Sequence, residues 1–469
     1  MRLFGRGALA LFLLPVLVGC PAIIPDPDPD PTIDDAKVLA ETLKWNRLAI
    51  DASGVDHMDL STATAPGPVL AARAMAIVHI AMADVVAAAS GEFLTYSRTL
   101  STPEGISVEA AIAQSAHDTL IASFPAQAAT FDSALAESLD AVEDGVAQDA
   151  GIAFGAESAD LILAARQDDG SNVPYEYVVS DQPGAWRPDP LNPGQMALGE
   201  EYFQIKPFVM NSVTQFRSPA PPAMDSAEYA EAFDEVKRLG GDGITTLTER
   251  TPDQEIAGIY WAYDGTPSLC APPRLYNQIT TTIADQEDVT GVQTARLLAL
   301  VNVGMADAGV ACWESKYHYN FWRPVTGIRE ADTDGNAATE ADPTYVPLCA
   351  PASNATAGQP NFTPPFPAYP SGHATFGGAL FETLRDFFGT DAVEFTFVSD
   401  EYNGVTRDNE GNVRPLVERT FSTLSQAEEE NGQSRIYLGI HWAYDKTEGI
   451  EMGNKVADHV IANAFQPVE

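Results

Sequence analysis

The chain has 469 residues and a formal net charge of −40, from 66 acidic and 26 basic residues. This length allows a large hydrophobic core, and the acidic excess disfavours binding of nucleic acid or of an anionic membrane by the bulk surface. Any cluster of arginine and lysine in such a chain therefore needs a specific explanation.

The first residues predict an export signal. Arg2 and Arg6 precede an apolar stretch that is too short to span a membrane comfortably, and the stretch ends in LVGC, whose cysteine is Cys20. This pattern is typical of a secretory signal peptide, predicted here over 1–19. The last four residues resemble a bacterial lipobox, which would make Cys20 the lipidated first residue of the mature protein. We therefore expect an exported bacterial lipoprotein, attached to a membrane through its lipid alone, on the outer-membrane, periplasmic or cell-surface side.

The next segment, 20–33, is rich in proline and aspartate and predicts an extended tether. An Ala-rich stretch with helical periodicity follows from about Asp34 to Arg166. An irregular insert is then expected at 167–222, which is dense in proline, glycine, aspartate and aromatic residues. We expect 34–285 to form an N-terminal helical region that includes this insert.

Helical patterns resume after the insert. The stretch from Ser226 to Gly240 begins with a typical N-cap residue and ends at a glycine. Helical periodicity continues through 251–265 and through a long stretch that begins near Gly291. Strand patterns are scarce, so the sequence predicts a mainly α fold, a helical bundle with irregular loops and few or no strands. The C-terminal region, 286–469, is expected to carry the chemistry.

Two internal stretches, 69–89 and 295–313, are apolar enough to suggest membrane spans. Both contain charged residues, which suit a buried helix better than one that faces lipid. Beyond Cys20 the chain has three cysteines, Cys270, Cys312 and Cys349, whose spacings fit no zinc site. An exported protein permits one disulfide among them, and no pairing is predicted.

The segment FPAYPSGHATFGG, residues 366–378, suggests an anion site. Apolar residues at helical spacing follow it, and Gly389 is a natural stop for that helix. Ser371 is expected to cap the helix, which places His373 in its first turn. A helix N-terminus offers unpaired N–H groups and the positive end of the helix dipole, and both favour a bound anion.

Two further segments supply charged side chains. A single long helix is predicted to carry Lys316 and Arg323, which lie seven residues apart and so on one face. Near the C-terminus Arg435 precedes His441 and Asp445, which share a face if that segment is helical. A carboxylate that accepts one ring N–H of a histidine fixes its tautomer and orients the other nitrogen.

These segments together predict a site for a tetrahedral oxyanion. Three cations and a helix N-terminus can hold an anion that bears two or three negative charges. The histidine that a carboxylate orients, His441, suits attack on the central atom or coordination to it. The second histidine, His373, suits proton transfer.

The same residues resemble the three-part signature of the vanadium haloperoxidase and type-2 phosphatidic acid phosphatase (PAP2) superfamily. The signature reads K-x6-R-P, then P-S-G-H, then S-R-x5-H-x3-D. The chain matches every fixed position: Lys316, Arg323, Pro324, Pro370, Ser371, Gly372, His373, Ser434, Arg435, His441 and Asp445. Other segments, such as KWNRLAIDA and GAWRPDP, are similar to the bacterial haloperoxidase-like branch, so the resemblance covers most of the mature chain.

The resemblance implies a vanadate cofactor, with His441 as the axial ligand of vanadium, Asp445 as its orienting group and His373 as the acid–base group. It also implies a set of groups that hold the vanadate oxygens: Lys316, Arg323, Ser371, the Gly372 amide and Arg435. The implied reaction is the oxidation of halide by hydrogen peroxide, with an organic molecule as the final halogen acceptor. Trp313 and Phe366 match chloroperoxidase pocket residues, although core packing explains either aromatic equally well.

Two other functions stay open from the sequence. In an acid phosphatase of the PAP2 superfamily, His441 would attack a phosphate ester and form a phosphohistidine, and His373 would protonate the leaving alcohol. A non-catalytic lipoprotein that binds an oxyanion would need little more than the cations.

Residues 330–342 resemble part of a calcium-binding loop, since acidic residues alternate before Gly335. Ala341 stands where such loops carry their last acidic ligand. A solvated acidic turn is therefore favoured over a calcium ion at this segment.

Overall fold

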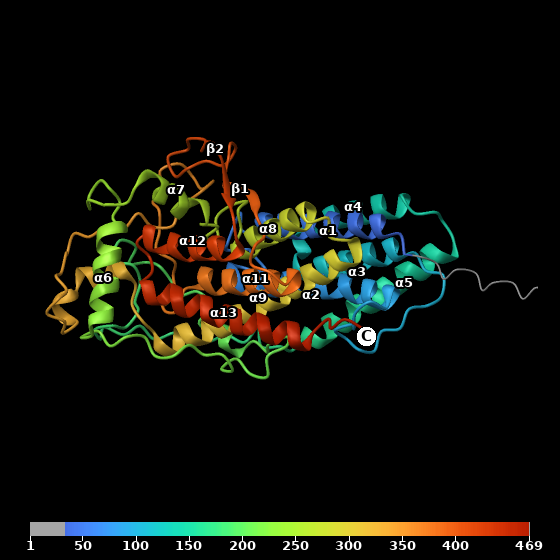
Figure 1. The fold of residues 1–469 in the computed structure, drawn as a ribbon, viewed down its shortest axis with the longest axis horizontal. Helices are drawn as coiled ribbons and strands as arrows, with labels where there is room; N and C mark the ends of the chain where they lie inside the picture. Colours follow the sequence, from blue (N-terminus) through green and yellow to red (C-terminus); the bar gives the residue numbers. More distant parts are fainter. Residues whose placement is uncertain (1–32, 469) are drawn as a thin grey trace, which may run out of the picture. The chain divides into compact units, whose positions relative to one another are not determined.

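The computed structural model describes residues 33–468, and the structural statements below refer to this range. It contains thirteen α-helices, three short 3-10 helices and one antiparallel pair of strands (Figure 1). The predicted mainly α fold with few strands is confirmed. The predicted signal peptide, Cys20 and nearly all of the tether lie outside the described residues.

Five α-helices form the N-terminal part: α1 (Asp35–Asp56), α2 (Gly67–Ser90), α3 (Val108–Ser123), α4 (Ala128–Asp140) and α5 (Val146–Arg166), with the 3-10 helix η1 (Pro125–Gln127) before α4. Between α5 and α6 the one regular element is the 3-10 helix η2 (Tyr202–Gln204). The remaining chain there runs in turns and extended segments over the helices.

The second half contains α6 (Ala227–Leu239), α7 (Pro252–Tyr260), α8 (Pro272–Gln286), α9 (Gly291–Tyr319), α10 (Pro324–Arg329), η3 (Ala331–Thr333), α11 (Gly372–Phe388), α12 (Leu424–Tyr437) and α13 (Ala443–Asn463). Strands β1 (Phe395–Asn403) and β2 (Leu416–Phe421) pair between α11 and α12. Ser226 caps α6 by accepting the Tyr229 N–H, and Gly240 follows its end, so that sequence prediction is confirmed.

Helices α2 and α9 lie at the centre of the fold and pack against each other. Both are long and apolar enough to cross a membrane, but 89% of the most apolar window of α2 and 94% of that of α9 are buried inside the protein. As expected from the charges within them, they are core helices of this fold.

The C-terminal helices position the predicted site. Helix α11 packs most extensively against α13 and also contacts α9 and α12; α11, α12 and α13 lie side by side in orange and red in Figure 1. Two glycines of α13 allow this close packing. A Cβ at Gly453 would lie 2.2 Å from the Thr375 carbonyl oxygen, and one at Gly449 would lie 2.8 Å from that of Ser371. The start of α13 can therefore lie directly against the start of α11.

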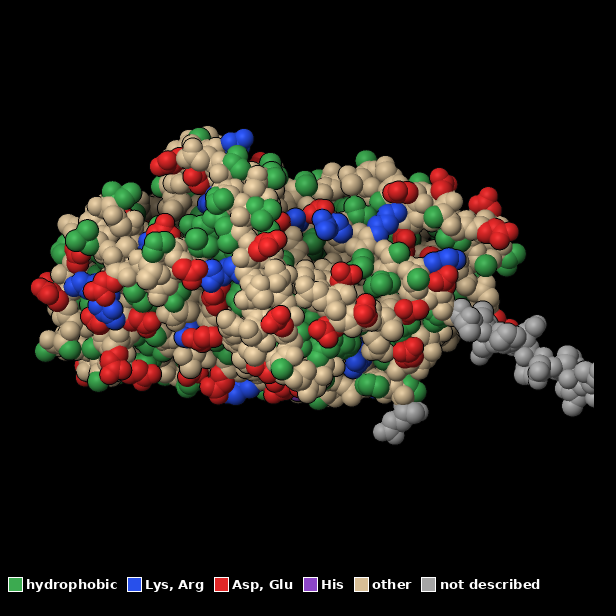
Figure 2. Space-filling model, turned by 45° about the horizontal axis from the view of Figure 1, so that its top comes forward, with side chains coloured by type: hydrophobic (Ala, Val, Ile, Leu, Met, Phe, Trp, Pro, Cys, Tyr) green, Lys and Arg blue, Asp and Glu red, His purple; other side chains and the backbone are tan. Residues whose placement is uncertain are grey.

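The charge pattern agrees with the composition. On the face drawn in Figure 2, acidic side chains are spread widely and outnumber the lysines and arginines. The three cysteines in the described part of the chain, Cys270, Cys312 and Cys349, are all buried and free, so none of them forms a disulfide here.

Candidate functional site

The N-terminus of α11 has the expected structure. Ser371 is the N-cap residue, and its hydroxyl accepts the Ala374 N–H at 3.4 Å. Gly389 ends the helix in the left-handed conformation, with φ of 67°. Gly372 is the first helical residue and His373 lies in the first turn, with 7% of its surface exposed. The free N–H groups of this buried helix start therefore face the interior of the protein.

The second component is the pair of His441 and Asp445. The two residues do not share a helix as predicted, because α12 ends at Tyr437 and α13 begins at Ala443. His441 lies in the short connection, and Asp445 lies in the first turn of α13. They still meet, with 2.7 Å between His441 Nδ1 and Asp445 Oδ2.

This pair fixes the tautomer of His441. The carboxylate accepts the Nδ1–H, and it also accepts the Trp442 N–H at 3.0 Å. Nε2 is then unprotonated, and its lone pair accepts an N–H from Arg323 Nη1 at 3.0 Å. Burial, together with the charges of Arg323 and Lys316, holds the pKa of His441 well below its usual range. His441 is therefore a neutral imidazole with an unprotonated Nε2, as a nucleophile or a metal ligand must be.

Arg323 lies beside this histidine, although not on the helix that was predicted. Helix α9 ends at Tyr319 because Asn320 takes the left-handed conformation, with φ of 51°. Arg323 instead has extended backbone as the N-cap of α10, since the following Pro324 disfavours helical geometry in the residue before it. Its Nε donates to the Phe366 carbonyl and its Nη1 to that of Ile440, both at 2.9 Å.

Lys316 is completely buried on α9. Its ammonium donates to the carbonyls of Pro367 and Ala368 at 2.9 Å and also to that of Pro370. All three N–H donors are thus used by the loop that leads into α11. Burial lowers its pKa to about 7, and Arg323 contributes to the same shift. Lys316 thus contributes positive charge and fixes the loop, and none of its N–H groups is available to a ligand.

Arg435 on α12 has a partner that the sequence analysis missed. Its Nη2 donates to both carboxylate oxygens of Asp264, at 2.7 and 2.9 Å. The two side chains are only 1% and 5% exposed. Asp264 also lies 4.0 Å from Nε2 of His373. No local pattern marks this aspartate, because it lies 171 residues from Arg435 in the chain.

His373 is held by the same segment. Its Nε2–H donates to the Ala262 carbonyl, which leaves Nδ1 as the unprotonated ring nitrogen. Its own carbonyl accepts from Tyr276 Oη at 2.9 Å and from Asn431 Nδ2 at 3.0 Å. Burial and the nearby Arg435 lower the pKa of His373 to about 3. The imidazole is therefore neutral, and it is able to accept a proton at Nδ1.

The segment that provides Ala262 and Asp264 was predicted to be helical and is not. Helix α7 ends at Tyr260, and Tyr263 has a positive φ of 46°. Strand β1 holds this irregular segment in place: Ser399 donates to the Tyr260 carbonyl at 2.6 Å, and the Asp400 N–H donates to the Tyr263 hydroxyl at 2.6 Å. Ser399 thus satisfies a carbonyl that a continued helix would have paired, and Asp400 fixes the side chain of Tyr263.

Several buried donors in the pocket have no partner among the described residues. They are Nη2 of Arg323 and both Nε and Nη1 of Arg435. An unpaired buried donor costs about 1–3 kcal/mol, more when it is charged, so a set of them indicates a ligand with strong acceptors. Together with the helix start and the unprotonated Nε2 of His441, they fit a tetrahedral oxyanion such as vanadate or phosphate.

These groups adjoin a large cavity of about 1430 Å³, whose lining includes Gly372, His373, Arg435 and His441. Trp313 and Phe366 form part of its wall, with 4.8 Å between their ring centroids. The Phe366 ring also lies 5.2 Å from the Lys316 ammonium and 5.0 Å from the Arg323 guanidinium. Both aromatics are thus pocket residues that pack beside the buried cations.

Comparison with known proteins agrees with this geometry. A family model described as the VCPO second helical-bundle domain matches residues 296–469. The vanadium chloroperoxidase of Curvularia inaequalis is 31% identical over 506 residues, which cover 89% of this chain and 81% of that protein. The chain belongs to the vanadium haloperoxidase family. Membership implies a vanadate cofactor, with peroxide and halide as substrates.

Solved structures share the fold. A bacterial vanadium-dependent iodoperoxidase superposes with a TM-score of 0.72 at 24% identity, covering 92% of this chain and 97% of that one. A holo-type bacterial vanadium-dependent chloroperoxidase gives 0.64 at 17% identity, covering 85% and 92%. The predicted superfamily is confirmed.

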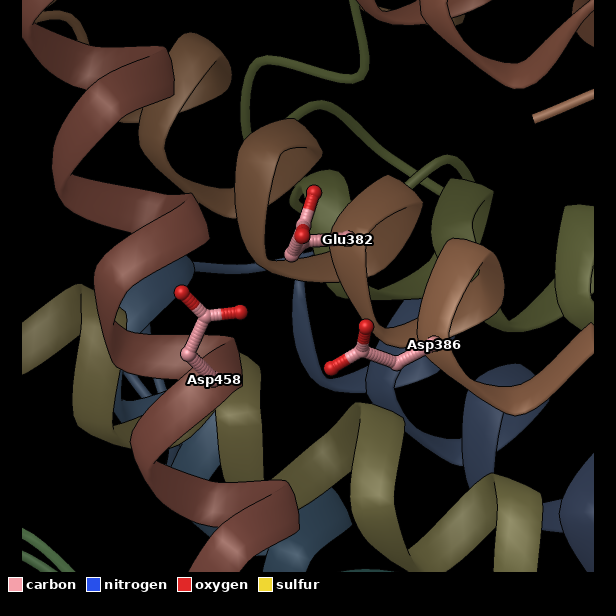
Figure 3. A group of neighbouring side chains, drawn as sticks. All are labelled: Glu382, Asp386 and Asp458. Carbon is pink, nitrogen blue, oxygen red and sulfur yellow. The ribbon is translucent and has the colours of Figure 1, made fainter. Parts of the chain in front are cut away.

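The suggested calcium segment gains no support. Glu330 pairs with Arg187, and Asp334 accepts hydrogen bonds from the Asn336 amide and the Thr339 hydroxyl. Within the described residues, the acidic side chains that do gather are elsewhere: Glu382 and Asp386 of α11 and Asp458 of α13 (Figure 3). The favoured interpretation of residues 330–342 remains an acidic turn.

Proposed function

We propose that this member of the family is a vanadium-dependent haloperoxidase that oxidises halide with hydrogen peroxide, with His441 as the ligand of vanadium. One observation carries the proposal. The unprotonated Nε2 of a carboxylate-oriented histidine lies beside buried guanidinium donors that have no partner.

The chain offers each group that such a cofactor needs. Arg323 would bind oxygens through Nη2, and Arg435 through Nε and Nη1, while the start of α11 adds the Ser371 hydroxyl and the Gly372 amide. The proposed role of Lys316 is mainly electrostatic, because its N–H groups already bind loop carbonyls.

When bound, vanadate supplies a Lewis acid that activates peroxide towards halide. The protein's own residues then control protons and orientation. Asp445 holds Nδ1–H of His441, so that Nε2 faces the anion site in the unprotonated form. His373, with its Nε2–H fixed on the Ala262 carbonyl, accepts and returns a proton at Nδ1.

The proposal is tested with the purified full-length protein in detergent. It is incubated with orthovanadate, then given hydrogen peroxide, a phenolic acceptor and chloride, bromide or iodide in turn. We expect halogenation that requires vanadate and is lost in His441→Ala. The control is His459→Ala, a partly exposed histidine on α13. Full activity in His441→Ala would overturn the proposal.

A parallel assay distinguishes a haloperoxidase from a phosphatase. A vanadate-free sample receives p-nitrophenyl phosphate, because the oriented His441 could also attack phosphorus. Hydrolysis that vanadate inhibits, without halogenation, would assign the site to phosphate esters. Absence of both activities, with retained phosphate binding, would leave a non-catalytic oxyanion-binding protein.

Export and lipidation are a separate proposal, which rests on the sequence around Cys20. A Cys20→Ser variant should fail to incorporate labelled fatty acid in bacterial cells, and it should leave the membrane fraction. Unchanged labelling in the variant would contradict the assignment.

A further inference from the structure

We propose that the cavity above the oxyanion pocket binds the organic halogen acceptor, and that this acceptor is an aromatic molecule with a cationic group. The inference rests on the proposed haloperoxidase function and names the substrate class of that site. It depends on the size of the cavity, on its walls and on the charge of its lining.

The cavity is larger than peroxide and halide need. Its volume is about 1430 Å³, and it reaches the proposed catalytic groups directly, since His373 and His441 form part of its lining. Pockets for drug-sized ligands usually measure roughly 300–1,000 Å³. An organic molecule can therefore enter and place a reacting atom close to the site where halide is oxidised.

The walls suit an aromatic ring. They include Leu198, Phe362 and Phe366, and many prolines complete the surface. Leu198 and Phe362 are half-buried, and Phe366 is 9% exposed. Trp313 and Phe376 are almost completely buried beneath this surface, with 4.8 Å between the ring centroids of Trp313 and Phe366. Aromatic walls of this kind favour stacked or edge-to-face contacts with a ring.

The lining carries an excess of negative charge. Its side chains include Asp59, Asp189, Asp242 and Asp264 but only one arginine, Arg435, and no lysine among the described lining residues. Arg435 is paired with Asp264. The other three aspartates accept hydrogen bonds from amides of their own loops, three of them in the case of Asp242. None of these three aspartates forms an ion pair with a lysine or arginine in the described part of the chain, and a cationic ligand complements them.

The histidines of the cavity do not reverse this charge. His57 is a neutral imidazole, because its Nδ1–H donates to the Ser53 carbonyl at 2.8 Å and its Nε2 accepts the Gly67 N–H at 3.1 Å. It therefore adds no charge to the cavity. His373 and His441 are neutral because their pKa values are lowered.

The reaction in the cavity is a substitution on the ring. The proposed activity supplies hypohalous acid, and a ring carbon attacks its halogen. The oxygen–halogen bond breaks as the carbon–halogen bond forms, and the ring proton joins the released hydroxide to give water. An acceptor held in the cavity reacts before the hypohalous acid escapes, so the enzyme selects among acceptors that free reagent treats alike.

The test uses the vanadate-loaded full-length protein with bromide and peroxide. Two phenols compete in one tube: (4-hydroxyphenethyl)trimethylammonium, a cation that cannot form a bromamine, and 3-(4-hydroxyphenyl)propionate, an anion. The product ratio is compared with that from reagent hypobromous acid in the same buffer. We expect the enzyme to favour the cation at least about fivefold over the reagent at low salt. A ratio equal to the reagent ratio would overturn the proposal.

Charge variants identify the source of the preference. Asp59→Asn and Asp242→Asn keep the shape of the loops and should each lower the preference by about two- to fivefold. Asp144→Asn, an exposed control between α4 and α5, should leave it unchanged. An unchanged ratio in both cavity variants would contradict the assigned role of the lining.

A binding measurement separates this inference from the proposed function. Calorimetry without peroxide should detect the cationic phenol and a weaker or absent signal from the anionic one. If the cation binds but nothing is brominated, the proposed function fails while the cavity preference stands. If bromination proceeds at the reagent ratio and neither phenol binds, the cavity assignment fails and the haloperoxidase function stands.

Discussion

Replacement of Asp445 by alanine is expected to cost most of the activity. Oδ2 of Asp445 accepts both the Nδ1–H of His441, at 2.7 Å, and the Trp442 N–H, at 3.0 Å. Alanine would leave both of these buried donors without a partner. With no acceptor to hold the proton on Nδ1, it can move to Nε2, the atom that now accepts an N–H from Arg323 at 3.0 Å.

The size of the effect follows from these two lost hydrogen bonds. Each buried donor that is left without a partner costs about 1–3 kcal/mol, so the two together represent about 2–6 kcal/mol. Expressed as lost transition-state stabilisation, this corresponds to a loss of roughly 30- to 25,000-fold in kcat/KM.

Three measurements check this prediction. Halide oxidation gives the activity, tungstate titration gives the oxyanion affinity, and nitrogen NMR of the histidines gives the tautomer. Asp458→Ala, an exposed position on the same helix, is the matched control and should behave like the natural protein. Activity within about tenfold of the natural protein, with Nδ1–H still present, would refute the reasoning about the tautomer.

Three further predictions follow from the same geometry. Binding of tungstate, a tetrahedral dianion that does not titrate near neutrality, should take up protons at pH 7–9, because the lowered pKa of Lys316, about 7, rises again beside an anion. The affinity for tungstate should therefore fall as the pH rises through this range. Calorimetry in two buffers would measure the proton uptake, and a release of protons on binding would contradict the prediction. Gly453→Ala should destabilise the protein by about 1–3 kcal/mol, since its Cβ would lie 2.2 Å from the Thr375 carbonyl, whereas Gly194→Ala, with open space around it, should not. Thermal unfolding compares the two. The KM for halide should fall when sodium nitrate is raised from about 10 to about 150 mM, because the Debye screening length then shortens from roughly 30 to about 8 Å and the acidic cavity repels the halide less. A constant KM would show that the aspartates of the cavity do not repel the halide.

Much of the site could be predicted from local sequence. The cap at Ser371, the helix start after it and the meeting of His441 with Asp445 depend on residues only a few positions apart. Short-range spacing constrains such contacts strongly, because the backbone gives few ways to arrange four residues. The roles assigned to these residues remain predictions.

Other features could not be predicted in this way. The end of α9 depends on a left-handed Asn320, which hydrophobic periodicity does not indicate, so Arg323 was expected on the wrong element. The end of α7 at Tyr260 depends on strand β1, more than a hundred residues further along the chain, which satisfies the irregular backbone after it. The partner of Arg435 depends on a contact over 171 residues. A single sequence carries no signal for such long-range pairing.

The contact between α11 and α13 has a consequence for thermal motion. The Ser371 N–H donates to the Asp445 carbonyl at 2.9 Å, so the helix start that faces the anion and the turn that orients His441 share a backbone hydrogen bond. Small rigid-body displacements of one helix must carry the other with them. The distance from the imidazole to the helix start should therefore vary little as the protein fluctuates. Helix α12, which carries Arg435, is tied to the same unit, because Asn431 Nδ2 donates to the His373 carbonyl at 3.0 Å and the Ile440 N–H donates to the Arg435 carbonyl at 3.2 Å. Heating should thus leave the mutual alignment of the histidine, the helix start and Arg435 intact until these helices separate.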